Sequence, residues 1–154
     1  MQIRSRAFSS GFDIATATET FTTDGSSWGE MLIFNSAGTQ IARVVLPTLF
    51  SSEYGIFISG EGGYGFKRHG IMKSHWTCEG EGRVLEFREV AERWFSARSR
   101  FAILEGLKKI AEISIMLFSD LYEVDLLEDG DLKLVCGMVI AIRLDARQSS
   151  VQPM

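Results

Sequence analysis

The stretch Asp131-Leu-Lys-Leu-Val-Cys-Gly-Met-Val-Ile-Ala-Ile-Arg-Leu-Asp145 decides the fold of this chain. Only Lys133 and Arg143 interrupt its apolar run, one near each end. Asp131 is a residue type that commonly caps a helix, and a helix apolar on all sides must be buried on all sides. The β-branched residues and Gly137 also allow a fully buried strand. We favour a helix over about residues 131–145, because the stretch is long and begins with a cap.

The sequence before this stretch consists of short apolar runs separated by turn signals. Clusters of Gly, Asn, Ser and Asp recur along the chain, with β-branched and aromatic residues between them, as is typical of an all-β sandwich or barrel. We predict hairpins over Met31–Leu46, Tyr54–Arg68 and Phe101–Ile115, and a half-buried strand at Tyr122–Leu126. We count about eleven candidate strands before Gly130. A closed barrel of that size covers a helix on every side, because roughly eight strands already enclose a lumen that side chains fill.

One segment conflicts with this reading of the sequence. Phe87, Val90, Ala91, Trp94 and Phe95 are spaced as on one face of a helix. Periodicity alone therefore favours a helix between residues 84 and 97, whereas strands there would be short and broken.

Two hairpins carry a similar pattern of apolar strand, glycine turn and then Ile-Ala followed by a charged residue. They are Leu32-Ile-Phe-Asn-Ser-Ala-Gly-Thr-Gln-Ile-Ala-Arg43 and Ser99-Arg-Phe-Ala-Ile-Leu-Glu-Gly-Leu-Lys-Lys-Ile-Ala-Glu-Ile113. With Tyr122-Glu-Val and the apolar block 132–144, they resemble the tubby C-terminal-like superfamily, which includes LURP-one-related proteins and phospholipid scramblases. The resemblance is one of pattern and covers about residues 10–146.

The resemblance implies a mostly β (α+β) fold, a closed antiparallel β-barrel of about twelve strands around a buried apolar C-terminal helix. On that basis we expect residues 84–97 to be strands, against their helical periodicity. We expect residues 1–10 to form an N-terminal arm, residues 11–146 a single tubby-like barrel domain, and residues 147–154 a flexible tail.

Composition restricts the classes of function. The chain has 154 residues, and 20 acidic against 16 basic residues give a formal charge of −4, which argues against a surface devoted to nucleic acid. Cys78 and Cys136 are too few for a disulfide scaffold or a zinc site. The N-terminus lacks the apolar core of a secretory signal, and no apolar run approaches the ~20 residues of a membrane span. We expect a soluble cytoplasmic protein without a cofactor.

The candidate binding site is a set of cations that we call the basic wall. Its members are Lys67, Arg68, Lys73, Arg83, Arg88, Arg93, Arg98, Arg100, Lys108 and Lys109. The tubby branch of the superfamily binds phosphoinositides through cations on the barrel wall, although no motif here maps residue by residue onto that site. Interspersed glutamates also allow an ordinary solvated exterior. We therefore expect a non-catalytic binding or interaction module whose partner is an unknown protein or an anionic lipid head group, with a peripheral phosphoinositide-binding protein as the alternative.

His69, His75 and Cys78 raise the further possibility of a small enzyme with a site at one barrel mouth. His75 and Cys78 suggest a metal pair or an activated thiol. An offset of three places them on opposite faces of a strand, however, and the sequence shows no complete set of metal ligands. The glycines between residues 60 and 65 lack the Lys-Ser/Thr of a phosphate-binding loop, so we predict a tight hairpin turn there. We assign no catalytic residue and no metal site.

Overall fold

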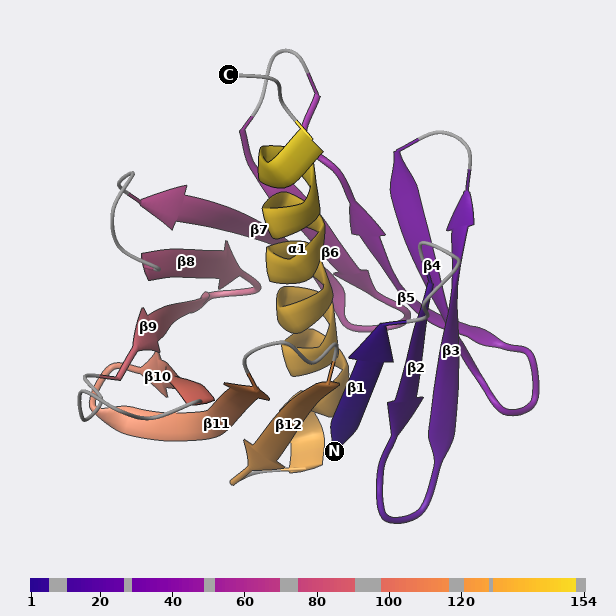
Figure 1. Ribbon diagram of the computed structural model, residues 1–154, viewed down its shortest axis with the longest axis horizontal. Coiled ribbons are helices and arrows are strands. Elements are labelled where there is room, and N and C mark those ends of the chain that lie inside the picture. The colour runs from indigo at the N-terminus through magenta and orange to yellow at the C-terminus, as the bar shows by residue number, and fades with distance from the viewer. Residues whose placement is uncertain are drawn as a thin grey trace.

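In a computed structural model the described residues are 1–5, 11–26, 29–48, 52–69, 75–90, 98–116, 121–127 and 129–151. They form a closed antiparallel barrel of strands around one long helix (Figure 1). The elements are β1 (Gln2–Ser5), β2 (Phe12–Ala15), β3 (Thr20–Ser26), β4 (Glu30–Asn35), β5 (Gln40–Val45), β6 (Tyr54–Ile58), β7 (Gly62–His69), β8 (His75–Gly80), β9 (Arg83–Glu89), β10 (Arg98–Glu105), β11 (Lys108–Met116), β12 (Leu121–Leu126), the 3₁₀ turn η1 (Asp129–Asp131) and α1 (Leu132–Val151). The predicted fold class is confirmed.

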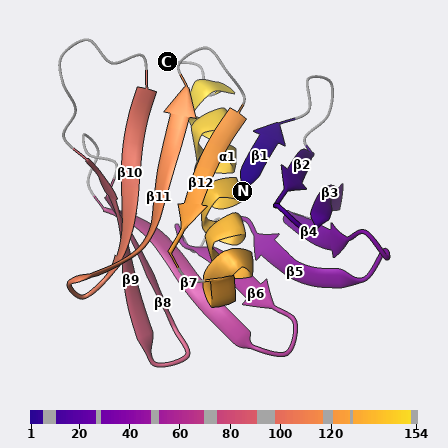
Figure 2. The same cartoon turned by 90° about the horizontal axis from the view of Figure 1, so that it is seen from below.

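The strands follow one another around the barrel in chain order, and β1 pairs with both β2 and β12 to close it (Figure 2). All three predicted hairpins are present, as β4–β5, β6–β7 and β10–β11. In the β4–β5 hairpin, Oδ1 of the Asn35 side chain accepts hydrogen bonds from the backbone N–H groups of Ala37 and Thr39, and these bonds stabilise the turn. Gly38 supplies the positive φ of 82° that this turn requires.

The structure differs from the expectation that residues 1–10 form an N-terminal arm. Gln2–Ser5 belongs to the barrel, with Ile3 opposite Tyr122 on β12 and Ile14 on β2. Ile3 is completely buried. The four residues therefore close the cylinder, because without them β2 and β12 would present unpaired edges.

The structure describes part of the segment 84–97, for which periodicity and the resemblance gave conflicting predictions. Arg83–Glu89 is strand β9, with Leu85 and Phe87 buried and Val84 exposed, as period-two alternation requires. Pairing with β8 and β10 fixes Arg83–Glu89 as a strand, as expected from the resemblance. Residues 91–97 lie outside the described residues.

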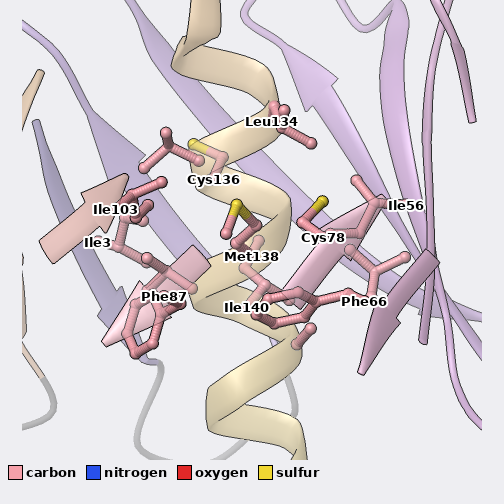
Figure 3. Close-up of a cluster of buried hydrophobic side chains, with 14 of the residues drawn as sticks. Ile3, Ile56, Phe66, Cys78, Phe87, Ile103, Leu134, Cys136, Met138 and Ile140 are labelled. Carbon is pink, nitrogen blue, oxygen red and sulfur yellow. The ribbon is translucent and has the colours of Figure 1, made fainter. Parts of the chain in front are cut away.

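The helix occupies the inside of the barrel. Every residue from Leu134 to Ala141 is buried, and the helix contacts β5 and β6. Figure 3 shows Ile56 and Phe66 to one side of it and Ile3, Phe87 and Ile103 to the other. The helix continues to Val151, past the expected end near residue 145 and into the segment predicted as a tail. Residues 152–154 lie outside the described residues.

Candidate functional site

The start of the helix is held to the barrel wall by Arg83. This residue has the same strand parity as Leu85 and Phe87, so its side chain turns toward the inside. Its Nε lies 2.8 Å from Oε2 of Glu105, and its Nη1 lies 2.7 Å from Oδ1 of Asp131. The hydrogen bond from Arg83 lowers the pKa of Glu105, and the bonds to Glu105 and Asp131 raise the pKa of Arg83. We call this group the entry clasp.

A second contact holds the helix further along its length. Nη1 of Arg68 lies 3.1 Å from Oδ2 of Asp145, and the Tyr54 hydroxyl donates a 3.4 Å hydrogen bond to Oδ1 of the same carboxylate. Burial, and then the charge of Asp145, raise the pKa of Tyr54 above its ordinary value. We call this group the exit clasp. Two members of the basic wall, Arg68 and Arg83, thus bind the chain's own helix.

The other members of the basic wall are spread over several strands. Lys67 and Arg88 point outward from β7 and β9, and Arg100 lies beside Gln2, Glu112 and Glu123 in a polar hollow. Lys109 pairs with Glu112 at 2.6 Å, and Lys108 lies next to the β10–β11 turn. The side chain of Arg98 is not among those described, and Lys73 and Arg93 lie outside the described residues. The described members of the basic wall therefore do not all face the same way, because Arg68 and Arg83 turn toward Asp145 and Asp131 whereas Lys67 and Arg88 face outward.

Two histidines meet on the outside of the barrel. His69 and His75 are directly opposite each other on β7 and β8, with ring centroids 5.4 Å apart. Nε2 of His69 lies 2.6 Å from Oγ1 of Thr77, and Nε2 of His75 lies 3.7 Å from Oε2 of Glu86. These residues, with the neighbouring cations, form what we call the β7–β9 cluster. Its members are Lys67, His69, His75, Thr77, Glu86 and Arg88.

Sequence reasoning did not find the β7–β9 cluster as a unit. Arg88 forms an ion pair with Glu86 and stands opposite His75, while Lys67 stands opposite Thr77. The signal was present in the sequence, because these residues occupy alternate positions on three consecutive strands. Reading it required the register between the strands.

Cys78 lies away from both histidines. It is completely buried on the inner face of β8, whereas His75 is on the outer face, as their offset of three predicted. Burial raises the pKa of the Cys78 thiol to about 12, which disfavours the reactive thiolate. Among the residues that the structure describes, no group of three or more His, Cys, Asp or Glu side chains is placed to hold a metal ion.

A hollow of about 650 Å³ lies at the barrel mouth where the helix begins. Partly buried apolar side chains, including Met1, Ile41 and Leu132, contribute to its lining, and Glu19 and Lys133 add charge. The hollow does not include either histidine or Cys78. The three residues of the suggested enzyme site are thus not gathered at this mouth.

No helix among the described residues has the length and apolar character needed to cross a membrane. Comparison of the chain with protein-family models, curated proteins and solved structures gave no match. The closed twelve-stranded antiparallel barrel with its C-terminal helix is consistent with the tubby-like fold.

Proposed function

We propose that this protein is a non-catalytic binding module of the tubby-like type, whose ligand is held on the outside of the barrel. The observation that carries the proposal is the filled lumen. Leu134 to Ala141 are buried within the cylinder, where a carrier barrel of this strand number would hold its ligand. A ligand therefore has the outer wall and the barrel mouths available to it.

The two clasps support this assignment. Asp131 joins the turn before the helix to the wall, and Asp145 joins the helix itself to the wall, so the helix acts as a fixed core. A wall closed by hydrogen bonds and braced from within is a rigid scaffold, on which exposed side chains keep their relative positions. Rigid positioning lowers the entropic cost of binding at a surface site.

Titration with a fluorescent long-chain fatty acid tests whether the lumen is filled. We expect no saturable one-to-one binding by the native protein. A Met138→Ala variant, probed with benzene or xenon, provides a second test, because Met138 is completely buried and its truncation leaves an apolar cavity that small apolar compounds can enter. Benzene or xenon binding by this variant alone would agree with the proposal, and stoichiometric fatty-acid binding by the native protein would refute it.

Binding of anionic lipid head groups is the second candidate function, and the β7–β9 cluster is the observation that favours it. Lys67, Arg88 and two histidines surround Thr77 on one outward face, with Glu86 as an acidic neighbour held by Arg88. Phosphate oxygens accept charge-assisted hydrogen bonds from Lys and Arg side chains. Each cation near an anionic membrane surface contributes about 1 kcal/mol to binding.

Vesicle co-sedimentation tests this second function. Phosphatidylcholine vesicles with and without a phosphoinositide are mixed with the native protein at low and high salt. The double variant Lys67→Ala/Arg88→Ala should bind about thirtyfold more weakly, from about 2 kcal/mol of lost attraction. Lys109→Ala is the control, because Lys109 lies outside the cluster and pairs with Glu112. Binding that is absent, insensitive to salt or unchanged in the double variant would reject this function.

A further inference from the structure

An apolar groove with acidic side chains lies on the outer face of β6 and β7, and we call it the acidic groove. Its volume is about 600 Å³. The lining residues that matter here are Glu53, Gly55, Phe57, Gly63, Gly65 and Glu81. Both of its charged lining residues are glutamates, whereas the β7–β9 cluster further along β7 carries cations.

The floor of the acidic groove is made of glycine. Gly55 and Gly65 are directly opposite each other on β6 and β7, and Phe57 is opposite Gly63. A Cβ atom at either Gly55 or Gly63 would lie 2.8 Å from the Phe57 ring, so the ring rests on these two glycines. Phe57 is nevertheless 39% exposed, which is unusual for a large aromatic side chain. The groove thus offers a partly exposed aromatic ring as its apolar surface.

The carboxylates of Glu53 and Glu81 also lie over glycines of β7. A Cβ atom at Gly65 would collide with Oε1 of Glu53, and one at Gly62 would collide with Oε1 of Glu81. Oε1 of Glu81 also accepts a 3.3 Å hydrogen bond from the backbone N–H of Gly63. Both glutamates are exposed, and their carboxylates lie against the backbone of β7 in the groove, where an incoming cation can reach them.

A cation of the chain itself, Arg43, already contacts the Phe57 ring. The guanidinium carbon of Arg43 lies 4.6 Å from the centroid of the Phe57 ring, and the same guanidinium pairs with Glu30 at 3.3 Å. A cation over an aromatic ring with a carboxylate nearby is thus already present at one edge of the groove. Glu53 and Glu81 supply the carboxylates further along.

We propose that the acidic groove binds an extended segment of a partner protein through an arginine or lysine side chain. The cation pairs with Glu53 and Glu81, and the aliphatic stem of the side chain packs on the part of Phe57 that Arg43 leaves exposed. Charge complementarity selects this occupant, because anionic membranes and nucleic acids are repelled by a groove whose charged lining is acidic. The site is separate from the β7–β9 cluster, so the vesicle experiment does not decide it.

The proposal is tested by titrating ¹⁵N-labelled full-length protein with the peptide acetyl-Leu-Arg-Leu-amide. The matched ligand is acetyl-Leu-citrulline-Leu-amide, which keeps the shape of arginine and lacks its charge. We expect saturable chemical-shift changes at the backbone amides of Gly55, Gly63 and Gly65, and affinity at least about tenfold lower for citrulline, from about 1.4 kcal/mol of lost ionic interaction.

Glutamine variants test whether the peptide binds in the acidic groove or elsewhere on the protein. Glu53→Gln and Glu81→Gln should each weaken binding of the arginine peptide by about fivefold to tenfold, from about 1–1.4 kcal/mol per charge-assisted bond. Glu19→Gln, the same change in the exposed β2–β3 turn, should leave it unaltered. Equal binding of the two peptides, shifts confined to other residues, or no saturable shift at millimolar peptide would overturn the proposal. Glycine-amide shifts produced by anionic vesicles in place of the peptide would also overturn it.

Discussion

Replacement of Gly137 by alanine tests whether the helix is enclosed by the barrel. Gly137 lies in the second turn of α1, buried against β6. A Cβ atom there would lie 2.6 Å from Cγ2 of Ile56, closer than non-bonded carbon atoms approach. Ile56 is itself completely buried, so in a close-packed core its methyl group moves only by displacing other side chains.

The sign of the Gly137→Ala effect distinguishes an enclosed helix from an exposed one. On an exposed helix this replacement stabilises by about 1 kcal/mol, because alanine is the better helix former. Overpacking of a close-packed core costs about 1–3 kcal/mol. The difference predicts a net loss of about 1 kcal/mol of unfolding free energy, which lowers Tm by about 2–4 °C in a domain of this size.

Urea unfolding followed by circular dichroism measures the effect, with Gly130→Ala as the control. A Cβ atom at Gly130 meets nothing within 4 Å, so that variant should change stability by less than about 0.5 kcal/mol. The double variant Gly137→Ala/Ile56→Ala should lose at least about 1 kcal/mol less than the sum of the single losses, because the truncated Ile56 makes room for the new methyl group. Stabilisation by Gly137→Ala, or strict additivity in the double variant, would refute a helix enclosed against β6.

Three further outcomes follow from the clasps and the buried thiol. A double-mutant cycle with Arg83→Ala and Asp131→Ala should give a coupling energy of about 1–2 kcal/mol, since the pair is only partly screened by solvent; a value near zero would remove the entry clasp as a stabilising contact. Because the pKa of Cys78 is raised to about 12, Ellman's reagent at pH 8 should leave Cys78 unlabelled in the folded protein and label it in urea, as mass spectrometry of the peptide can show. The folded-state pKa of Tyr54 is raised, so its contribution to stability is complete below its unfolded pKa of about 10 and is lost as pH rises above that value. Denaturation between pH 9 and 11 should therefore show a steeper alkaline loss for the native protein than for Tyr54→Phe, and parallel curves would contradict this.

The architecture was accessible from sequence because its strongest signals are local. The apolar run from Leu132 to Leu144 predicts a buried helix, and the repeated strand-turn-strand pattern predicts hairpins such as β4–β5. Each signal depends on residues close together in the chain. The closing strand β1 gave no comparable signal, because Gln2–Ser5 is short and its pairing with β12 joins opposite ends of the sequence.

The same difference between local and long-range information applies to the charged residues of the barrel. The order of residues showed where cations are concentrated, but it did not show that Arg68 and Arg83 pair with Asp145 and Asp131 while Lys67 and Arg88 face outward. Inward or outward orientation depends on strand parity and register, and a shift of one residue reverses every side chain. The sequence by itself determined the hairpins and the apolar helix, because these arise from local periodicity. Only the tertiary structure decided which charges brace the core and which face solvent, because that choice depends on pairing between distant strands.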